Sequence, residues 1–336
     1  MTNSATAAGR AAWCSHAVLK VALLAGVIAS PLLASGPVDF GLAELKSVIE
    51  ERGLNPNSFK VSVEYSMALP EEGFQIQGLV IRGGSRRAVM YGLLEAADQL
   101  RERKALTAMK ATPKFDIRAA RLVADAETLA RPDKDWNELF VNLARARFNR
   151  LRLEMPALSA ESEQRLARIA QMAEEHAVDL ALSLDEIDSS LVLKLLGESI
   201  AFKAVEVPPA VVQVALPALS EAGRYVTLDV AAESLTNEMR KTALEMHVPL
   251  LELSKSATAA APHVWLAGLS DLEPLRTLAA GGSAGFETGP LPARWNDIDH
   301  QLGNWSALAF TEERGKSAVR DSSAKKPRAA KKKIKR

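Results

Sequence analysis

The 336 residues are enough for two domains, and a composition of 48% hydrophobic and 25% charged residues excludes a chain too polar to form buried cores. The net charge of +1 hides an asymmetry, because the segment from Gly315 onward carries +9 and the remainder carries −8. The single cysteine, Cys14, precedes an apolar run near the start of the chain. This position excludes disulfides and cysteine-ligated metals from the rest of the chain.

Residues 1–36 have the pattern of an export signal. Arg10 and Lys20 precede an apolar run from Val21 to Ala34 that ends in small residues. The run has about 14 residues, fewer than the roughly 20 that a membrane-spanning helix needs. We expect the leader to be removed on export to the periplasm or the cell exterior, which leaves no transmembrane span in the mature chain. An uncleaved membrane anchor is the alternative.

A small α/β domain is predicted over residues 38–112. Apolar residues recur at helical spacing before Gly53, two segments alternate as strands do, and a glycine-serine turn leads into a long amphipathic helix. The predicted elements are a helix over 42–50, strands over 59–65 and 74–82, and a helix over 86–104. Arg82, Arg86 and Arg87 border the turn, where they could hold an anionic sugar or serve as capping or solvated charges.

Strand and helix patterns alternate from Phe115 onward. About eight strands are predicted, and most of them are followed by a helix. The predicted strands cover 117–124, 148–154, 178–184, 202–207, 225–230, 248–253, 264–267 and 284–287. Repeated β–α units favour a parallel sheet with right-handed crossovers, and eight of them fit a compact (β/α)8 TIM-like barrel over residues 113–312. An open, doubly wound sheet is the alternative.

A basic tail is predicted over residues 313–336. It contains too few apolar side chains to bury a core of its own, so we expect it to be disordered. In an exported protein its charge favours contact with an anionic envelope surface rather than with nucleic acid. A tail that is merely solvated is the alternative.

Four segments carry a resemblance to a known class of enzymes. They are the turn and helix from Gly83 to Arg101 and the segments 113–121, 136–151 and 222–229. Together they resemble β-N-acetylhexosaminidases and α-glucuronidases, glycoside hydrolases in which a small α/β accessory domain precedes a catalytic barrel. In hexosaminidases an adjacent Asp-Glu pair follows a middle strand of the barrel. Here the one such pair near a strand end, Asp185-Glu186, follows an early strand.

Carboxylates recur where the predicted barrel strands end, at the rim where the βα loops of a TIM barrel meet. Glycoside hydrolysis needs two carboxyl groups about 5–9.5 Å apart, one protonated and one ionised. Repulsion between several carboxylates on one rim raises some of their pKa values, which is one way to keep an acid protonated. The catalytic candidates are Asp185, Glu186, Glu206 and Asp229, and the candidates for substrate binding are Glu154, Glu252 and Glu287. No metal or cofactor is expected, because the histidines have no partner at a metal-ligand spacing and no phosphate loop or dinucleotide fingerprint is present.

These patterns predict an exported, glycoside-hydrolase-like protein that acts on a glycan through paired carboxylates. The alternative is an inactive barrel that binds carbohydrate or organises a partner in the cell envelope. Short loops and the absence of tryptophans from the expected barrel loops favour this alternative.

Overall fold

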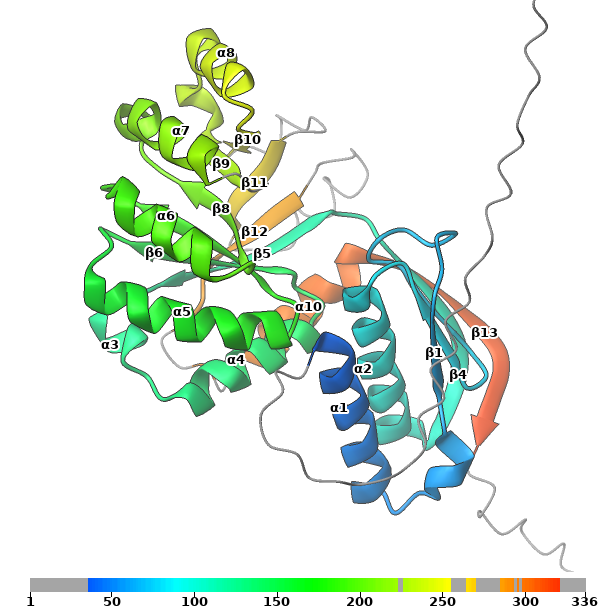
Figure 1. Ribbon diagram of the computed structural model, residues 1–336. Helices are drawn as coiled ribbons and strands as arrows, with labels where there is room; N and C mark the ends of the chain where they lie inside the picture. Colours follow the sequence, from blue (N-terminus) through cyan, green and yellow to red (C-terminus); the bar gives the residue numbers. More distant parts are fainter. Residues whose placement is uncertain are drawn as a thin grey trace, which may run out of the picture.

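The computed structural model describes residues 36–222, 226–254, 264–269, 285–292, 295 and 298–320. The predicted leader therefore lies outside the described residues except for Gly36, and so does the tail beyond residue 320. The helix predicted after residue 270 and part of the resembling segment 222–229 also lie outside them. Two units are present, a small mixed sheet with two helices and an eight-stranded barrel (Figure 1). No helix in the described part of the chain is long and apolar enough to cross a bilayer.

The small domain is a five-stranded sheet with helices on one face. Its elements are α1 (Pro37–Glu51), η1 (Pro56–Phe59), β1 (Ser62–Tyr65), β2 (Phe74–Gln77), β3 (Val80–Gly83), α2 (Arg86–Arg103), β4 (Ala105–Pro113) and β13 (Phe310–Arg320). The strand order is β1-β3-β2-β4-β13. The predicted strand over 74–82 is two antiparallel strands that turn at Gly78, whose φ of 62° favours glycine. The sequence interpretation also missed β4.

The glycine-serine turn before α2 is shaped by close backbone packing. Ser85 caps the helix, because its hydroxyl accepts a hydrogen bond from the amide of Ala88. A Cβ atom at Gly84 would lie 2.0 Å from the carbonyl oxygen of Pro70, so that position has no room for a side chain. The contact is with backbone, which cannot move aside as a flexible side chain would. The turn therefore fixes the start of α2 against the loop before β2.

Replacement of Gly84 by alanine is expected to destabilise the protein by about 1–3 kcal/mol, the usual range for an overpacked site. Gly197 provides the matched control, because it lies in a helix and a Cβ there meets nothing within 4 Å. Gly197→Ala should be neutral or slightly stabilising, since alanine is the better helix former. Urea denaturation of both variants measures the difference, and equal stability of the two would contradict the packing argument.

The larger unit is a closed parallel barrel, which confirms the predicted fold class and excludes the open sheet. Strand order around the barrel is β10-β11-β12-β5-β6-β7-β8-β9. The strands are β5 (Ile117–Val123), β6 (Arg150–Met155), β7 (Asp179–Leu184), β8 (Phe202–Glu206), β9 (Thr227–Ala231), β10 (Leu250–Ser254), β11 (Val264–Leu269) and β12 (Gly285–Pro290). All eight neighbouring pairs are parallel, as βαβ connections require.

Helices of the described chain surround the barrel. They are α3 (Ala126–Leu129), α4 (Asp133–Arg145), α5 (Ala160–Glu175), α6 (Ser189–Glu198), α7 (Val212–Glu221), α8 (Asn237–Glu245) and α10 (Ile298–Ala309), with 3-10 turns η2 (Pro209–Val211) and η3 (Ala232–Ser234). Most outward-facing side chains of the strands are apolar and pack under the helices, as Leu151 and Leu153 of β6 do. The core therefore lies between strands and helices, which leaves the inner face of the barrel to a different set of residues.

The C-terminal segment returns to the small domain, and this corrects the predicted boundary at residue 312. After α10 the chain forms β13, which pairs antiparallel with β4 from Phe310 opposite Pro113 to Arg320 opposite Ala105. Residues 313–320, which were expected to be part of a disordered tail, are therefore strand. Backbone hydrogen bonding to β4 explains the difference, since an edge strand gains order from its neighbour without a core of its own.

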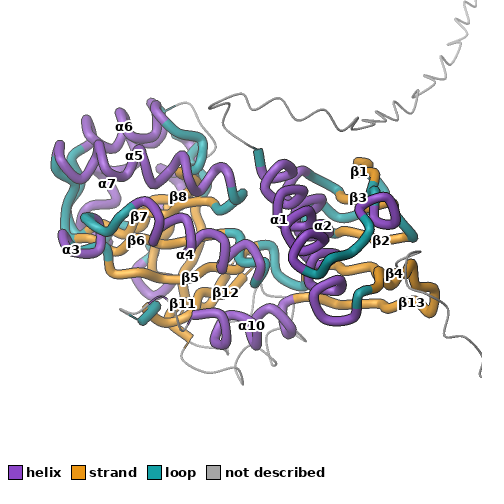
Figure 2. The backbone as a smooth tube through the Cα atoms, turned by 90° about the horizontal axis from the view of Figure 1, so that it is seen from below, coloured by secondary structure: helices purple, strands orange, loops and turns teal. Residues whose placement is uncertain are grey.

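Helices α1 and α2 lie between the small sheet and the barrel (Figures 1 and 2). Arg87 of α2 donates to Glu72, to the carbonyl oxygen of Ala177 and to Asp179 at the start of β7, with distances of 2.6–2.7 Å. Glu72 also accepts from Arg118 of β5, which is 1% exposed. A buried ionic cluster therefore joins the turn-and-helix segment to the bottom of the barrel.

Candidate functional site

Charged side chains occupy the inner face of the barrel. In β6 the outward residues are leucines, and the alternate positions are Arg150, Arg152 and Glu154, which point inward because successive side chains of a strand face opposite sides. Most TIM barrels fill these positions with valine, isoleucine and leucine. An aliphatic cluster remains on one side of this interior, where Ile117 and Ala119 meet Leu251 and Leu253. The other side is ionic.

Arg152 is the centre of the ionic side and is fully buried. Its Nε lies 2.5 Å from Glu287 Oε2 of β12, its Nη1 lies 2.9 Å from Glu206 Oε2 of β8, and its Nη2 lies 2.6 Å from Asp229 Oδ2 of β9. Asp229 and Glu287 are themselves 0% exposed. One guanidinium therefore joins carboxylates from three strands across the barrel.

Arg121 of β5 lies opposite Arg152 in the sheet register and makes a similar set of contacts on the side of the mouth, where it is 19% exposed. Its Nε is 2.8 Å from Glu154 Oε2, its Nη1 is 3.2 Å from Glu287 Oε1, and its Nη2 is 3.8 Å from Glu206 Oε2. Exposure rises in the same direction, to 20% for Glu206 and 45% for Glu154. The mouth cluster, defined as Arg121, Arg152, Glu154, Glu206, Asp229 and Glu287, therefore opens at the C-terminal ends of the strands.

Both arginines of the mouth cluster stay charged. Burial lowers the pKa of Arg152, but Glu287, Asp229 and Glu206 outweigh it and hold the pKa above its ordinary value. The pKa of Arg121 is also above its ordinary value. Burial lowers this pKa, but the nearby carboxylates Glu287, Glu154 and Glu206 raise it by more. One layer deeper, burial lowers the pKa of Arg150 despite the attraction of Asp229 and Asp179. By formal charge, the four carboxylates and two guanidinium groups of the mouth cluster leave an excess of two negative charges.

The structure brings together four of the seven predicted site residues. Glu154, Glu206, Asp229 and Glu287 share the two arginines. Glu252 is elsewhere, because its neighbours Leu251 and Leu253 take the inward positions of β10 and it pairs with Arg240 of α8 outside the barrel. The period of two along the strand explains why a prediction based on strand ends alone misplaced it.

Asp185 and Glu186 lie at the rim, just after β7. Both side chains are exposed, and both backbone amides donate to the carbonyl oxygen of Pro156, at 3.1 and 2.9 Å. Neither carboxylate has an ion pair with any residue in the described part of the chain. In the neighbouring strand pair, Ser183 of β7 lies opposite Glu206 of β8, so the Asp-Glu pair begins two residues beyond the level of Glu206.

Sequence interpretation missed the two arginines. The signal was present in the segment from Arg150 to Glu154, where charged and leucine residues alternate in a predicted barrel strand. In a strand whose leucines pack under helices, such alternation places the charges inside the barrel. Among the described residues there is no group of three or more histidine, cysteine or acidic side chains that could hold a metal ion.

Two solved structures with a similar fold are glycoside hydrolases. No protein-family model matches the chain, and no curated protein matches it significantly. Among solved structures, a GH138 enzyme targeting pectin rhamnogalacturonan II is similar with a TM-score of 0.63 and 12% identity over 83% of this chain. CpGH84B is similar with a TM-score of 0.51 and 12% identity over 83% of this chain and 68% of its own. The present chain spans half the length of the GH138 enzyme.

The fold is therefore that of a glycoside-hydrolase-like barrel with a small second domain. At 12% identity the likeness concerns the fold, and the chemistry of this chain has to be argued from its own mouth cluster.

Proposed function

We propose that the protein binds a neutral glycan at the C-terminal mouth of its barrel and does not hydrolyse it. The observation that carries this proposal is the pairing of every carboxylate of the mouth cluster with Arg121 or Arg152. The likeness of the fold to glycoside hydrolases supports a carbohydrate as the ligand. The predicted leader supports a glycan outside the cytoplasm.

Pairing with arginine suits binding better than hydrolysis. A glycosidase needs one carboxyl group that is protonated near neutral pH, usually through an apolar site or a like-charged neighbour. Guanidinium groups have the opposite effect, because they stabilise the ionised carboxylate. Ionised carboxylates are strong acceptors for sugar hydroxyls, and Glu154, Glu206 and Arg121 have exposed surface at the mouth. The excess of negative charge disfavours acidic sugars there.

Hydrolysis is the second candidate, and one observation favours it. Asp185 and Glu186 are exposed at the rim and have no ion pair within the described ranges, so neither carboxyl group is bound to an arginine there. Neighbouring parallel strands lie about 4.8 Å apart, which sets the scale of the separation between the ends of β7 and β8. Glu186 as acid and Glu206 as its partner would then form the pair.

Binding to the mouth can be tested with the purified full chain on an array of neutral and acidic oligosaccharides. We expect binding to neutral members, with affinity about tenfold lower in Glu154→Gln because a charge-assisted hydrogen bond is lost. Glu154 is exposed enough for the variant to fold as the parent does. Glu252→Gln is the matched control, since that residue lies outside the barrel, and it should bind normally.

Aryl glycosides, including N-acetylglucosaminides and glucuronides, separate the two candidates. We expect no release of the aryl group by the parent protein. Hydrolysis that falls by about 10²–10⁴-fold in Glu186→Gln would establish the second candidate, since this is the usual contribution of a general acid. Glycan binding that is the same in Glu154→Gln and Glu206→Gln as in the parent would show that the mouth cluster is not the site.

A further inference from the structure

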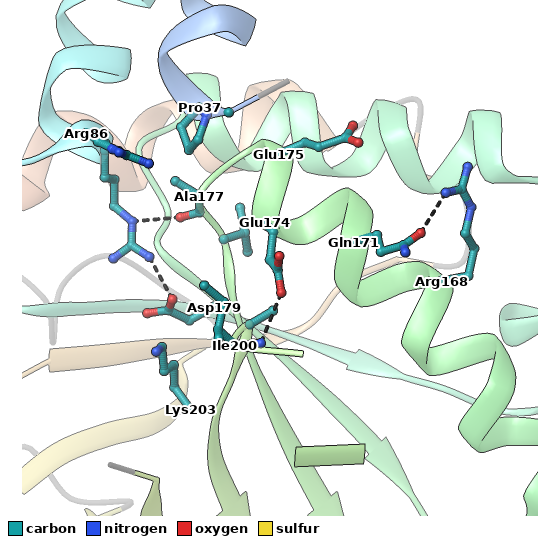
Figure 3. A pocket seen from close by; sticks show the side chains of 14 residues that line it. Pro37, Arg86, Arg168, Gln171, Glu174, Glu175, Ala177, Asp179, Ile200 and Lys203 are labelled. Carbon is teal, nitrogen blue, oxygen red and sulfur yellow. Dashed lines mark hydrogen bonds and ion pairs between the residues drawn. The ribbon is translucent and has the colours of Figure 1, made fainter. Parts of the chain in front are cut away.

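A cavity lies at the end of the barrel opposite the mouth. It is a cleft of about 630 Å³ between the small domain and the bottom of the barrel, within the size range of small-molecule sites. Its walls come from the start of α1 and α2, the end of α5, and the N-terminal ends of β7 and β8 (Figure 3). Because the strands are parallel, residues at these ends are separated from the mouth cluster by the length of the barrel.

Most charges that line the cleft are already paired. Arg87 is bound to Asp179 and Glu72, and Arg168 pairs with Asp133 outside the cleft. Glu174 accepts from the Ser199 hydroxyl and the amide of Ile200. These contacts fix the walls of the cleft. The charges of Arg87 and Arg168 are balanced by their acidic partners, whereas the donors to Glu174 are neutral and leave its charge unbalanced.

Three charged side chains remain, and two of them are cations. Arg86, Lys203 and Glu175 have no ion pair or side-chain hydrogen bond with any residue that the structure describes. Arg86 is exposed at the first position of α2, while Lys203 and Glu175 are half-buried. The cleft therefore offers two available cations to a ligand, together with one carboxylate.

Lys203 lies at an irregularity in the pairing of β7 with β8. Leu180 of β7 pairs with Phe202, but Ala181 pairs with Ala204, so Lys203 is the extra residue of a β-bulge. A bulge changes the direction of a side chain relative to a regular strand. Lys203 lines the cleft as a result, in a strand whose other inward positions are Ala204 and Glu206.

The remaining walls suit a polar ligand with an apolar face. Gln171 and Glu175 offer hydrogen-bonding groups along α5, and Pro37 and Ile200 offer apolar surface (Figure 3). A sugar ring combines hydroxyl groups at its edge with a face of C–H groups. An oxyanion on such a ring would meet Arg86 and Lys203.

We propose that this cleft is a separate binding site for an anionic sugar, which it recognises through Arg86 and Lys203. Carboxylate, phosphate and sulfate groups share the required oxyanion chemistry. This site complements the mouth, where the excess of negative charge favours neutral sugars.

Isothermal titration of the full chain with D-glucuronate, D-glucose 6-phosphate, D-glucose 6-sulfate and D-glucose tests the proposal. We expect at least one anionic sugar to bind at least about tenfold more tightly than glucose, and binding to weaken as salt is raised from 0.05 to 0.5 M. Arg86→Gln and Lys203→Gln should each raise the Kd by about tenfold, and the double variant should abolish measurable binding. Neither cation has a structural partner, so both variants should keep the stability of the parent.

Lys134→Gln is the matched control, because Lys134 is an exposed cation of α4 outside the cleft. Lys134→Gln should leave the Kd of the anionic sugar unchanged. Glu154→Gln at the mouth should also leave this Kd unchanged, so failure of the mouth proposal and failure of the cleft proposal can be told apart. Equal binding of glucose and the anionic sugars, or an unchanged Kd in the double variant, would overturn the proposal. Inorganic phosphate binding as tightly as glucose 6-phosphate would overturn its sugar component.

Discussion

Replacement of Arg152 by methionine should destabilise the protein by about 3–5 kcal/mol, the range measured when one partner of a buried ion pair is removed. Arg152 is fully buried and makes three ion pairs, two of them with carboxylates that have no exposed surface. Methionine fills much of the same volume but leaves Asp229 with an uncompensated charge inside the barrel. Urea denaturation at neutral pH measures the loss.

Arg168→Met is the control for Arg152→Met. Arg168 also makes an ion pair, with Asp133, but its side chain is 53% exposed, so its removal should change the stability by less than about 1 kcal/mol. Equal stability of the two variants would show that the mouth cluster contributes no more than a surface pair.

Replacement of Glu72 by glutamine should destabilise the protein by about 3 kcal/mol at neutral pH. Burial raises the pKa of Glu72, but Arg118 and Arg87 outweigh it and lower the pKa from 4.5 to about 2. Each pKa unit of difference between the folded and the unfolded chain corresponds to 1.36 kcal/mol. The lowered pKa of Glu72 therefore contributes about 3 kcal/mol to the free energy of unfolding. Glu72 joins the small domain to the barrel, so the loss should affect both units in one transition.

The dependence of this loss on pH has a definite sign. A carboxyl group whose pKa is lowered by folding stabilises the protein above its unfolded pKa, and this stabilisation disappears as the pH falls toward the folded pKa. The difference between the parent and Glu72→Gln should therefore be constant above about pH 5 and shrink between pH 4.5 and 2. Glu71→Gln, at the exposed neighbouring position, should show no such difference. A difference in stability between the parent and Glu72→Gln that did not change with pH would contradict the lowered pKa of Glu72 as its cause.

The ionic interior distinguishes this barrel from an aliphatic one in what it can do. Arg121 and Arg152 hold the mouth carboxylates in a connected set of ion pairs, and a guanidinium partner disfavours the protonated carboxyl group that a general acid needs. Asp185 and Glu186 are outside this arrangement. The catalytic question therefore depends on those two exposed residues more than on the buried cluster.

Part of the candidate site could be predicted from the sequence. Strand ends in a parallel barrel lie on one rim, so the sequence predicts seven acidic residues there, and Glu154, Glu206, Asp229 and Glu287 of this set share the two arginines in the structure. Glu252 was misplaced because strand ends give the level of a residue in the barrel but not the direction of its side chain. In β6 the alternation of leucine with charged residues does indicate direction, because it places the side chain of Arg152 inside the barrel.

The sequence by itself determined the eight barrel strands and the small domain ahead of them, because hydrophobic periodicity is local and shows which face of each element is buried. Only the tertiary structure decided which charges meet. Arg152 and Glu287 are separated by 135 positions in the chain, Arg87 and Asp179 by 92, and β13 joins β4 from the far end of the chain. Such pairs form when the barrel closes and the C-terminal strand pairs with β4. A local sequence pattern does not show which distant residues this closure brings together.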